Sequence, residues 1–288
     1  MANLKEIRSR ITSVGSTMQI TSAMKMVSAA KLKKAQDAIT AMRPYSDKLT
    51  ELLQTLSATL EGDAGSVYAE QREVKSVLVV AITSNRGLCG AFNTNIIKAS
   101  NLLAQSTYAG KKVSFVTVGK KGNDILKKNH YVTHNNNDIY DDLTFDNVTV
   151  IAERLMTLYR EGAYDKIVLV YNHFKNAATQ IVKTEDFLPI KPIESEETNN
   201  NSADYIFEPS KEEIIETLIP KSLKTQLYKA IRDSFASEHG ARMTAMHKAT
   251  DNAADLKAEL TLTYNKARQA AITNEILEIV GGAEALNN

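Results

Sequence analysis

The stretch of sequence that decides the fold is Leu4–Leu60, LKEIRSRITSVGSTMQITSAMKMVSAAKLKKAQDAITAMRPYSDKLTELLQTLSATL. Alternating steps of three and four residues along it meet 17 positions, of which 13 are apolar. A 3.5-residue repeat over such a length is typical of a helix in a left-handed coiled coil. At 1.5 Å per residue the helix would be about 85 Å long, so we expect it to extend beyond any small domain.

Two features interrupt this repeat. Pro44 should bend or loosen the helix, because proline removes a backbone hydrogen bond. Thr21, Lys25 and Ser28 put polar side chains on repeat positions. The apolar residues shift to neighbouring positions, Ala23, Met24, Met26 and Val27. We interpret this stretch as facing something other than a partner helix.

The C-terminal end has the same character from about residue 212 to 286, where Pro220 is the only proline. Small residues recur every four positions, at Ala241, Ala245, Ala249 and Ala253, which allows two helices to approach closely. Ile272, Ile276 and Ile279 then form an aliphatic stripe. Two long helices, each with one apolar face, pair most simply as an antiparallel hairpin.

The middle of the chain alternates strand and helix patterns. Short apolar runs at 77–82, 113–118 and 166–172 read as buried strands, with an edge strand possible at 179–183. Helical patterns separate them, at 91–105, 121–129 and 148–160. This order predicts an α/β domain with a parallel, Rossmann-like sheet. The expected organisation is an N-terminal coiled-coil helix at 1–60, the α/β domain at 75–190, an acidic linker or foot at 191–209, and a C-terminal coiled-coil helix at 210–288.

Composition supports long helices. The 288 residues include only 12 glycines and 5 prolines, and aromatic residues make up 6%. A loop-rich sandwich or barrel would need many more turn residues. The single cysteine excludes an internal disulfide framework, and no apolar run approaches the length of a membrane span. The first residues have no signal-peptide pattern, so we expect them to belong to the mature protein.

The net charge of +1 hides a strong segregation of charge. Residues 1–36 carry seven basic side chains and one acid, whereas residues 185–216 carry ten acids and two lysines. Such an uneven distribution of charge indicates something about binding partners rather than about the fold. The basic helix could meet nucleic acid, an anionic membrane surface or acidic protein loops, or could simply be solvated. The first 44 residues contain no aromatic side chain for base stacking, which disfavours nucleic acid.

The search for a reaction centre finds no catalytic constellation. The turns at 83–93 and 118–122 follow strands and carry glycines, but neither has a complete phosphate-binding motif, so packing or a protein contact is favoured. Cys89 reads as a small buried residue rather than a nucleophile. A solvated surface role is expected for all five histidines, which are His130, His134, His173, His239 and His247. We expect no cofactor and no metal site.

Four segments together resemble one family, the gamma subunit of the F-type ATP synthase, in its bacterial form. They are MKMVSAAKLKKAQ (24–36), SNRGLCGAFN (84–93), DYIFEP (204–209) and ITNEILEIVGGAEAL (272–286). The last contains the family's C-terminal signature, and the four segments occur in the family's order along the whole chain.

The resemblance implies a non-catalytic central rotor shaft. Its terminal helices would form a left-handed antiparallel coil inside the hexamer of alpha and beta subunits, one shaft per three pairs. Ion flow would turn the membrane c-ring and the shaft with it, and the shaft would drive the catalytic beta subunits through different conformations. The epsilon subunit would be a further partner. The implied location is the cytoplasmic face of the bacterial plasma membrane, without a membrane span.

The resemblance also implies contact residues. Met24, Lys25, Arg268, Gln269 and Thr273 match positions that contact the beta subunit; plain surface exposure is the competing interpretation of the last three. Ile276, Ile279 and the tip residue Leu286 match the family's bearing, the end of the shaft that turns within an apolar collar of alpha and beta subunits. Tyr205 and Glu208 match the family's foot, the region that meets epsilon and the c-ring. Ordinary coiled-coil packing is the competing account of the bearing aliphatics, and a plain linker that of the foot.

One alternative belongs to another class of protein. A stand-alone Rossmann-like nucleotide-binding protein with a coiled-coil dimerisation arm would have the same element order. It would bind nucleotide as an isolated chain and form a homodimer, whereas a rotor shaft would do neither.

Overall fold

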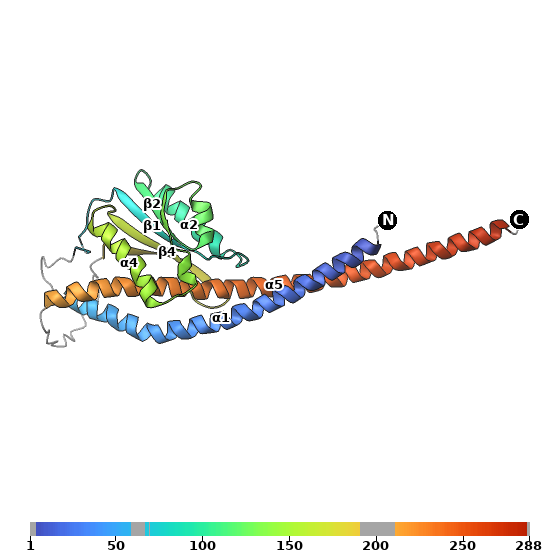
Figure 1. The fold of residues 1–288 in the computed structure, drawn as a ribbon, viewed down its shortest axis with the longest axis horizontal. Helices are drawn as coiled ribbons and strands as arrows, with labels where there is room; N and C mark the ends of the chain where they lie inside the picture. Colours follow the sequence, from blue (N-terminus) through green and yellow to red (C-terminus); the bar gives the residue numbers. More distant parts are fainter. Residues whose placement is uncertain (1–3, 59–66, 69, 191–210, 287–288) are drawn as a thin grey trace. The chain divides into compact units, whose positions relative to one another are not determined.

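The computed structural model describes residues 4–58, 67–68, 70–190 and 211–286. Packing divides the chain into two units, Met1–Ala29 with Arg242–Asn288, and Ala30–Ala241. Two long helices, α1 (Leu4–Ala58) and α5 (Lys211–Leu286), pass through both units, and each continues through its internal proline (Figure 1). The four-part organisation drawn from the sequence follows chain order rather than packing, and it stays a prediction.

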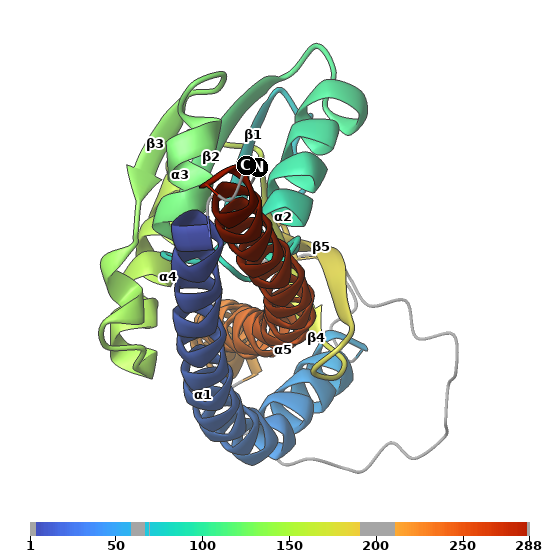
Figure 2. The ribbon, with the colours of Figure 1, turned by 90° about the vertical axis from the view of Figure 1, so that its right-hand side faces the viewer.

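The unit Ala30–Ala241 contains one mixed sheet of five strands in the order β3-β2-β1-β4-β5. The strands are β1 (Ser76–Ile82), β2 (Lys112–Val118), β3 (Val132–Asn135), β4 (Lys166–Phe174) and β5 (Gln180–Leu188). The first four are parallel and β5 runs antiparallel to β4. β3 and β5 therefore form the two edges of the sheet, as Figure 2 shows.

The predicted strands and the α/β fold class are confirmed, and the edge strand that the sequence suggested is longer than expected. β3 is a strand that was not predicted from the sequence. β3 has only four residues, all half-buried, and it pairs with β2 alone. A short edge strand of this kind lacks the apolar run that marks the central strands.

Helices cover both faces of the sheet. Along β1, successive side chains alternate between the faces, as the pleat requires. Leu78, Val80 and Ile82 pack in one core with α4 (Phe145–Arg160) and the 219–231 part of α5. The intervening β1 residues, Val77, Val79 and Ala81, pack in a second core with α2 (Phe92–Leu102) and α3 (Lys120–Leu126).

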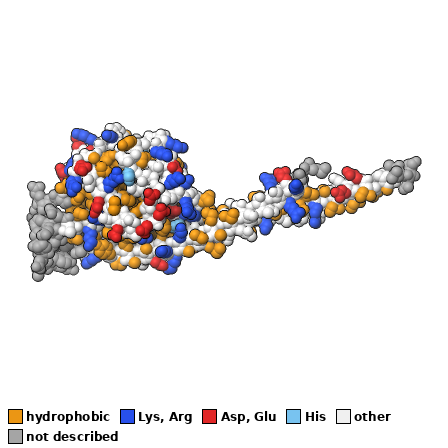
Figure 3. Space-filling model, viewed as in Figure 1, with side chains coloured by type: hydrophobic (Ala, Val, Ile, Leu, Met, Phe, Trp, Pro, Cys, Tyr) orange, Lys and Arg blue, Asp and Glu red, His pale blue; other side chains and the backbone are white. Residues whose placement is uncertain are grey.

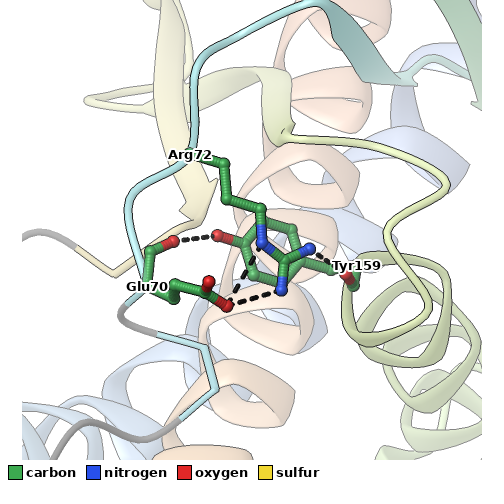
Figure 4. A network of polar contacts seen from close by, with 3 residues as sticks. All are labelled: Glu70, Arg72 and Tyr159. Carbon is green, nitrogen blue, oxygen red and sulfur yellow. Dashed lines mark hydrogen bonds and ion pairs between the residues drawn. The ribbon is translucent and has the colours of Figure 1, made fainter.

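A polar network ties the segment before β1 to the end of α4 (Figure 4). The hydroxyl of buried Tyr159 donates to the Glu70 carbonyl at 2.5 Å. The Arg72 guanidinium donates to the Tyr159 carbonyl at 3.1 Å and to the Glu70 carboxylate at 2.6 Å. The bond from Arg72 lowers the pKa of Glu70. These contacts fix the entry to the sheet at its amino-terminal edge.

The turn after β2 requires glycine. Gly119 has φ +107°, and a Cβ there would lie 2.2 Å from the Thr83 carbonyl oxygen. We therefore expect Gly119→Ala to lower the free energy of unfolding by about 3 kcal/mol or more, from strain and overlap together. Gly110→Ala is the matched control, because Gly110 also has positive φ, +77°, but nothing lies within 4 Å of its Cβ position. Denaturant unfolding of the full-length chain measures both, and equal losses would contradict the overlap argument.

Candidate functional site

The unit of Met1–Ala29 and Arg242–Asn288 is a pair of packed helical segments. In α1, the repeat positions from Leu4 to Ser28 are buried or half-buried, and the positions between them are mostly exposed. In α5 the less exposed residues also follow steps of three and four, at Met246, Thr250, Ala253, Lys257, Leu260, Tyr264, Ala267 and Ala271. This 3.5-residue spacing on both helices is the seam that the sequence predicted.

The contacts across the seam show that the helices are antiparallel, as predicted. The hydroxyls of Thr21 and Thr250 are 2.8 Å apart, and the Lys25 Nζ lies 3.4 Å from the His247 Nδ1. Gly15 faces the Lys257 ammonium. Higher numbers on α1 therefore meet lower numbers on α5.

The seam continues through its polar positions, so the interpretation that the repeat is interrupted there was wrong. Thr21 and Ser28 are buried, and Lys25 is half-buried. Their polar atoms are satisfied locally: Ser28 donates to the Met24 carbonyl at 2.8 Å, and Thr21 donates to that of Met18 at 3.1 Å. A hydrogen-bonded polar group can occupy a buried seam without a large penalty, so the repeat continues through this stretch.

Since the polar residues face the seam, neighbouring apolar residues of α1 face away from it. Met26 is 65% exposed, and Ile20 and Val27 are also more than half exposed. Met24, a predicted contact residue, is half-buried. This stretch thus presents apolar side chains outward, as the sequence suggested, while its polar side chains hold the helix pair together.

The antiparallel register also determines where α5 loses its partner. With the offset set by Thr21–Thr250, the described start of α1 at Leu4 faces α5 near Arg268. Beyond that level α5 continues as a single helix to Leu286. Its large aliphatic side chains are 48–71% exposed, at Ile272, Ile276, Leu277, Ile279 and Val280. Figure 3 shows hydrophobic side chains at the surface along this helix.

The exposure of this stripe bears on the two predicted bearing residues that the structure describes. Ile276 and Ile279 do not pack in the coil of this chain, because 55% and 71% of their surfaces are exposed. The predicted contact residues Arg268, Gln269 and Thr273 are exposed as well. The Thr273 hydroxyl donates to the Gln269 carbonyl at 3.0 Å, one turn earlier.

The side chains of three predicted contact residues lie outside the part of the chain that the structure describes. Leu286 ends α5, and its side chain lies outside the described residues, as do Tyr205 and Glu208. Other residues on the outward surface were not predicted as contacts, namely Ile20, Met26, Val27, Leu262 and Val280. These residues could have been predicted from the sequence, because each is a large apolar residue that lies outside the 3.5-residue repeat.

The glycine-bearing turns at the carboxyl ends of β1 and β2 bond to each other. The Gly122 amide donates to the Thr83 hydroxyl at 2.9 Å, and the Lys121 amide donates to the Ser84 carbonyl at 3.0 Å. Amides at the start of a helix are the groups that hold phosphate in nucleotide-binding folds. Here two of them are used inside the chain, which supports the packing interpretation of both turns.

The crevice between β1 and β4, where the strand order reverses, is occupied by the chain itself. Nucleotides bind at this point in Rossmann-like folds. The Asn172 amide donates to the Phe92 carbonyl at 3.2 Å, and the Ser237 hydroxyl of α5 donates to the Asn172 carbonyl at 3.0 Å. Ala241 of α5 packs on Cys89 and Phe92. Cys89 is buried, as predicted. This packing argues against a nucleotide in the crevice.

The histidines are not all solvated, so that prediction was wrong. His239 is 5% exposed and packs edge-on against Phe235 at 4.5 Å between ring centroids. His173 Nδ1 lies 2.6 Å from the carboxylate of buried Asp233. These side chains lie where α5 covers the sheet, and residues of mixed polarity in that part of α5 gave no sign of burial.

The described residues contain neither a cluster of metal ligands nor a membrane-spanning helix. No group of three or more His, Cys, Asp or Glu side chains gathers as metal ligands would in the part of the chain that the structure describes. No helix in the same part has a stretch long and apolar enough to cross a membrane.

These features define a class of protein: one in which a two-helix coil with an outward apolar surface is joined to an α/β unit whose nucleotide crevice is filled by its own side chains. A family model described as ATP synthase matches residues 3–286. The ATP synthase gamma chains of Flavobacterium johnsoniae and Christiangramia forsetii are 73% and 72% identical to this chain, over 100% of both sequences in each case.

Solved structures show the same fold. A chain in the Euglena gracilis mitochondrial ATP synthase (OSCP/F1/c-ring) superposes with a TM-score of 0.72, at 23% identity, over 98% of this chain and 94% of its own length. A chain in the central stalk and c-ring structure of the Tetrahymena thermophila enzyme is 26% identical, with a TM-score of 0.59, over 80% of this chain and 99% of its own.

The chain belongs to the family of bacterial ATP synthase gamma chains. Its function is that of the central rotor stalk of the F1Fo ATP synthase, and the catalytic sites of that complex lie in other subunits.

The polar pair in the seam gives a test of the coil. Replacing one threonine by valine removes the bond between the helices, so Thr21→Val and Thr250→Val should each destabilise the pair by about 1 kcal/mol. The double variant should cost less than the sum, because two valines pack without an unmet polar group. Hydrogen exchange of the amides in residues 4–29 of the full-length chain measures this, with about fivefold faster exchange for each single variant.

Thr17→Val is the control for this cycle. Thr17 is exposed, and its hydroxyl bonds only to the Ser13 carbonyl of its own helix. Strictly additive effects of the two seam substitutions would show that the threonine pair does not couple the helices.

Proposed function

We propose that this rotor stalk couples to the catalytic subunits through two surfaces of the helix pair. One is the outward surface of α1 around Met24 and Lys25, and the other is the part of α5 that continues beyond α1. Each orientation of the stalk would contact open and closed beta subunits differently, and that difference in contact free energy is what shifts their conformations. The single observation that carries the proposal is the exposed aliphatic stripe from Ile272 to Val280.

The stripe suits a bearing. A continuous row of large aliphatic side chains on one helix marks a surface that is covered in an assembly. Hydrophobic contact is non-directional, so an apolar helix inside an apolar collar turns without breaking fixed hydrogen bonds. We assign the bearing to Ile276, Ile279 and the tip residue Leu286.

The polar residues next to the stripe suit contacts that depend on the orientation of the stalk. Arg268, Gln269 and Thr273 are exposed at the level where α5 loses its partner helix. Hydrogen bonds depend on direction, and those to a charged group are the strongest, so they form only in particular orientations of the stalk. We assign these three residues, with Met24 and Lys25, to contact with the beta subunit, Arg268 through a charge-assisted bond and Gln269 through a neutral one.

Further partners follow from the family. The Tetrahymena and Euglena structures are of rotors or F1 parts with a c-ring, and we propose that this chain binds the c-ring and the epsilon subunit through the foot that contains Tyr205 and Glu208. It would then work at the cytoplasmic face of the bacterial plasma membrane. The closed crevice between β1 and β4 disfavours the alternative of a stand-alone nucleotide-binding protein.

Co-purification with alpha and beta subunits tests the assembly. We expect a stable complex with one copy of this chain per three alpha–beta pairs. A homodimer that never captures alpha or beta, and that binds nucleotide, would instead support the alternative.

The polar contact is tested by Gln269→Leu in the assembled complex. Loss of one neutral hydrogen bond should weaken rotation-coupled ATPase activity or assembly by about two- to tenfold, with no change in the fold of the chain alone. Gln105→Leu is the matched control, since Gln105 is also exposed but lies on the α/β unit. Wild-type behaviour of Gln269→Leu in both assays would remove Gln269 from the contact.

The bearing is tested by Ile276→Ser combined with Ile279→Ser. Because both side chains are exposed, the unfolding of the chain alone should change by less than about 0.5 kcal/mol. The complex should lose thermal stability, because apolar contacts at the collar are lost. Val150→Ser, which alters a residue of α4 that is 67% exposed, should leave the complex unchanged. A complex as stable as wild type would rule out the bearing assignment.

A further inference from the structure

A small pocket lies between the edge of the sheet at β3 and helix α4, within the unit Ala30–Ala241. Its polar lining includes His134 and Arg154, and its apolar walls include Ile151, Leu155 and Leu158. The cavity is about 90 Å³. That is more than one water needs and far less than the roughly 300–1,000 Å³ of pockets for cofactors or nucleotides. The pocket therefore suits a ligand of a few non-hydrogen atoms.

The pocket has one positive charge, that of Arg154, whose side chain is exposed to solvent. No carboxylate within the described ranges forms an ion pair with Arg154 or His134. The adjacent acid of α4, Glu153, is already paired with Lys224 at 2.6 Å. Burial, and then the charge of Arg154, lower the pKa of His134, so its imidazole is neutral near pH 7 and has one N–H to donate. An anion would meet one cation and one neutral donor here.

A third donor lies in the same lining. Tyr164 also lines the pocket and is 9% exposed. Its hydroxyl can donate one hydrogen bond to an acceptor in the pocket.

We propose that this pocket binds a small carboxylate that carries a short aliphatic chain. The carboxylate oxygens accept hydrogen bonds from Arg154 and from His134 or Tyr164, and the aliphatic chain covers Leu155 and Leu158. Inorganic phosphate would accept hydrogen bonds from the donors but would make no contact with the apolar walls. A neutral amide would lack the charge-assisted bond to Arg154. The proposal does not depend on the rotor contacts described above.

The test titrates the full-length chain with butyrate, followed by ligand-observed NMR. We expect saturable binding, with butyramide and inorganic phosphate at least about tenfold weaker. Binding of butyramide as tight as that of butyrate would overturn the role of the charge. Equal or tighter binding of phosphate would overturn the assignment to an aliphatic carboxylate, and no saturable binding of butyrate would overturn the site.

Variants locate the site. Arg154→Gln should weaken butyrate binding by about tenfold or more. Arg160→Gln, which removes the same charge from the last turn of the same helix, should leave it unchanged. Leu158→Phe fills the pocket without removing charge and should also weaken binding, with circular dichroism confirming that each variant is folded. Equal effects of the two arginine variants, or wild-type binding by folded Leu158→Phe, would contradict the proposal.

Discussion

The narrow seam between α1 and α5 is the constraint on which the functional surface depends. Two helices packed through one 3.5-residue stripe leave most of each helix exposed, so the residues off the stripe are available to partners. Beside large apolar residues such as Ile7, the seam contains small and hydrogen-bonded polar residues, such as Ala253 and the Thr21–Thr250 pair. Other large apolar residues, including Met26 and Ile276, lie off the seam and are exposed. Such exposed side chains fit a protein whose apolar surface is completed by other subunits.

The α/β unit shows how a nucleotide-binding type of fold is converted into a scaffold. The strand order reverses beside β1, where such folds have their ligand crevice. Ser237 and Ala241 of α5 occupy that place, and the neighbouring turns bond to each other through Thr83 and Gly122. The same helix that fills the crevice continues into the coil, so closing the crevice also anchors the unit to α5.

The sequence predicted most of this fold because its signals were long or repeated. The heptad pattern in α1, the scarcity of glycine and proline, and the apolar runs of β1, β2 and β4 each stand out over their neighbours. β3 was missed because four half-buried residues on an edge strand produce no such run. The burial of His239 was missed because it depends on how α5 meets the sheet. In the helix pair, the polar positions were recognised but misread, since a sequence does not show that Thr21 finds Thr250 from more than 200 residues away. The contact residues themselves came from resemblance to the family, not from spacing.

The last part of α5 has a mechanical consequence. A paired helix resists twisting through its seam as well as through its own hydrogen bonds, whereas the segment beyond Arg268 has only the latter. Gly281 and Gly282 lie within this segment, with nothing within 4 Å of either Cβ position. Each glycine lowers helix stability by about 1 kcal/mol relative to alanine, so the tip is the most compliant part of the shaft when it stands alone. Torque is therefore carried more firmly where the second helix accompanies α5 than along the tip.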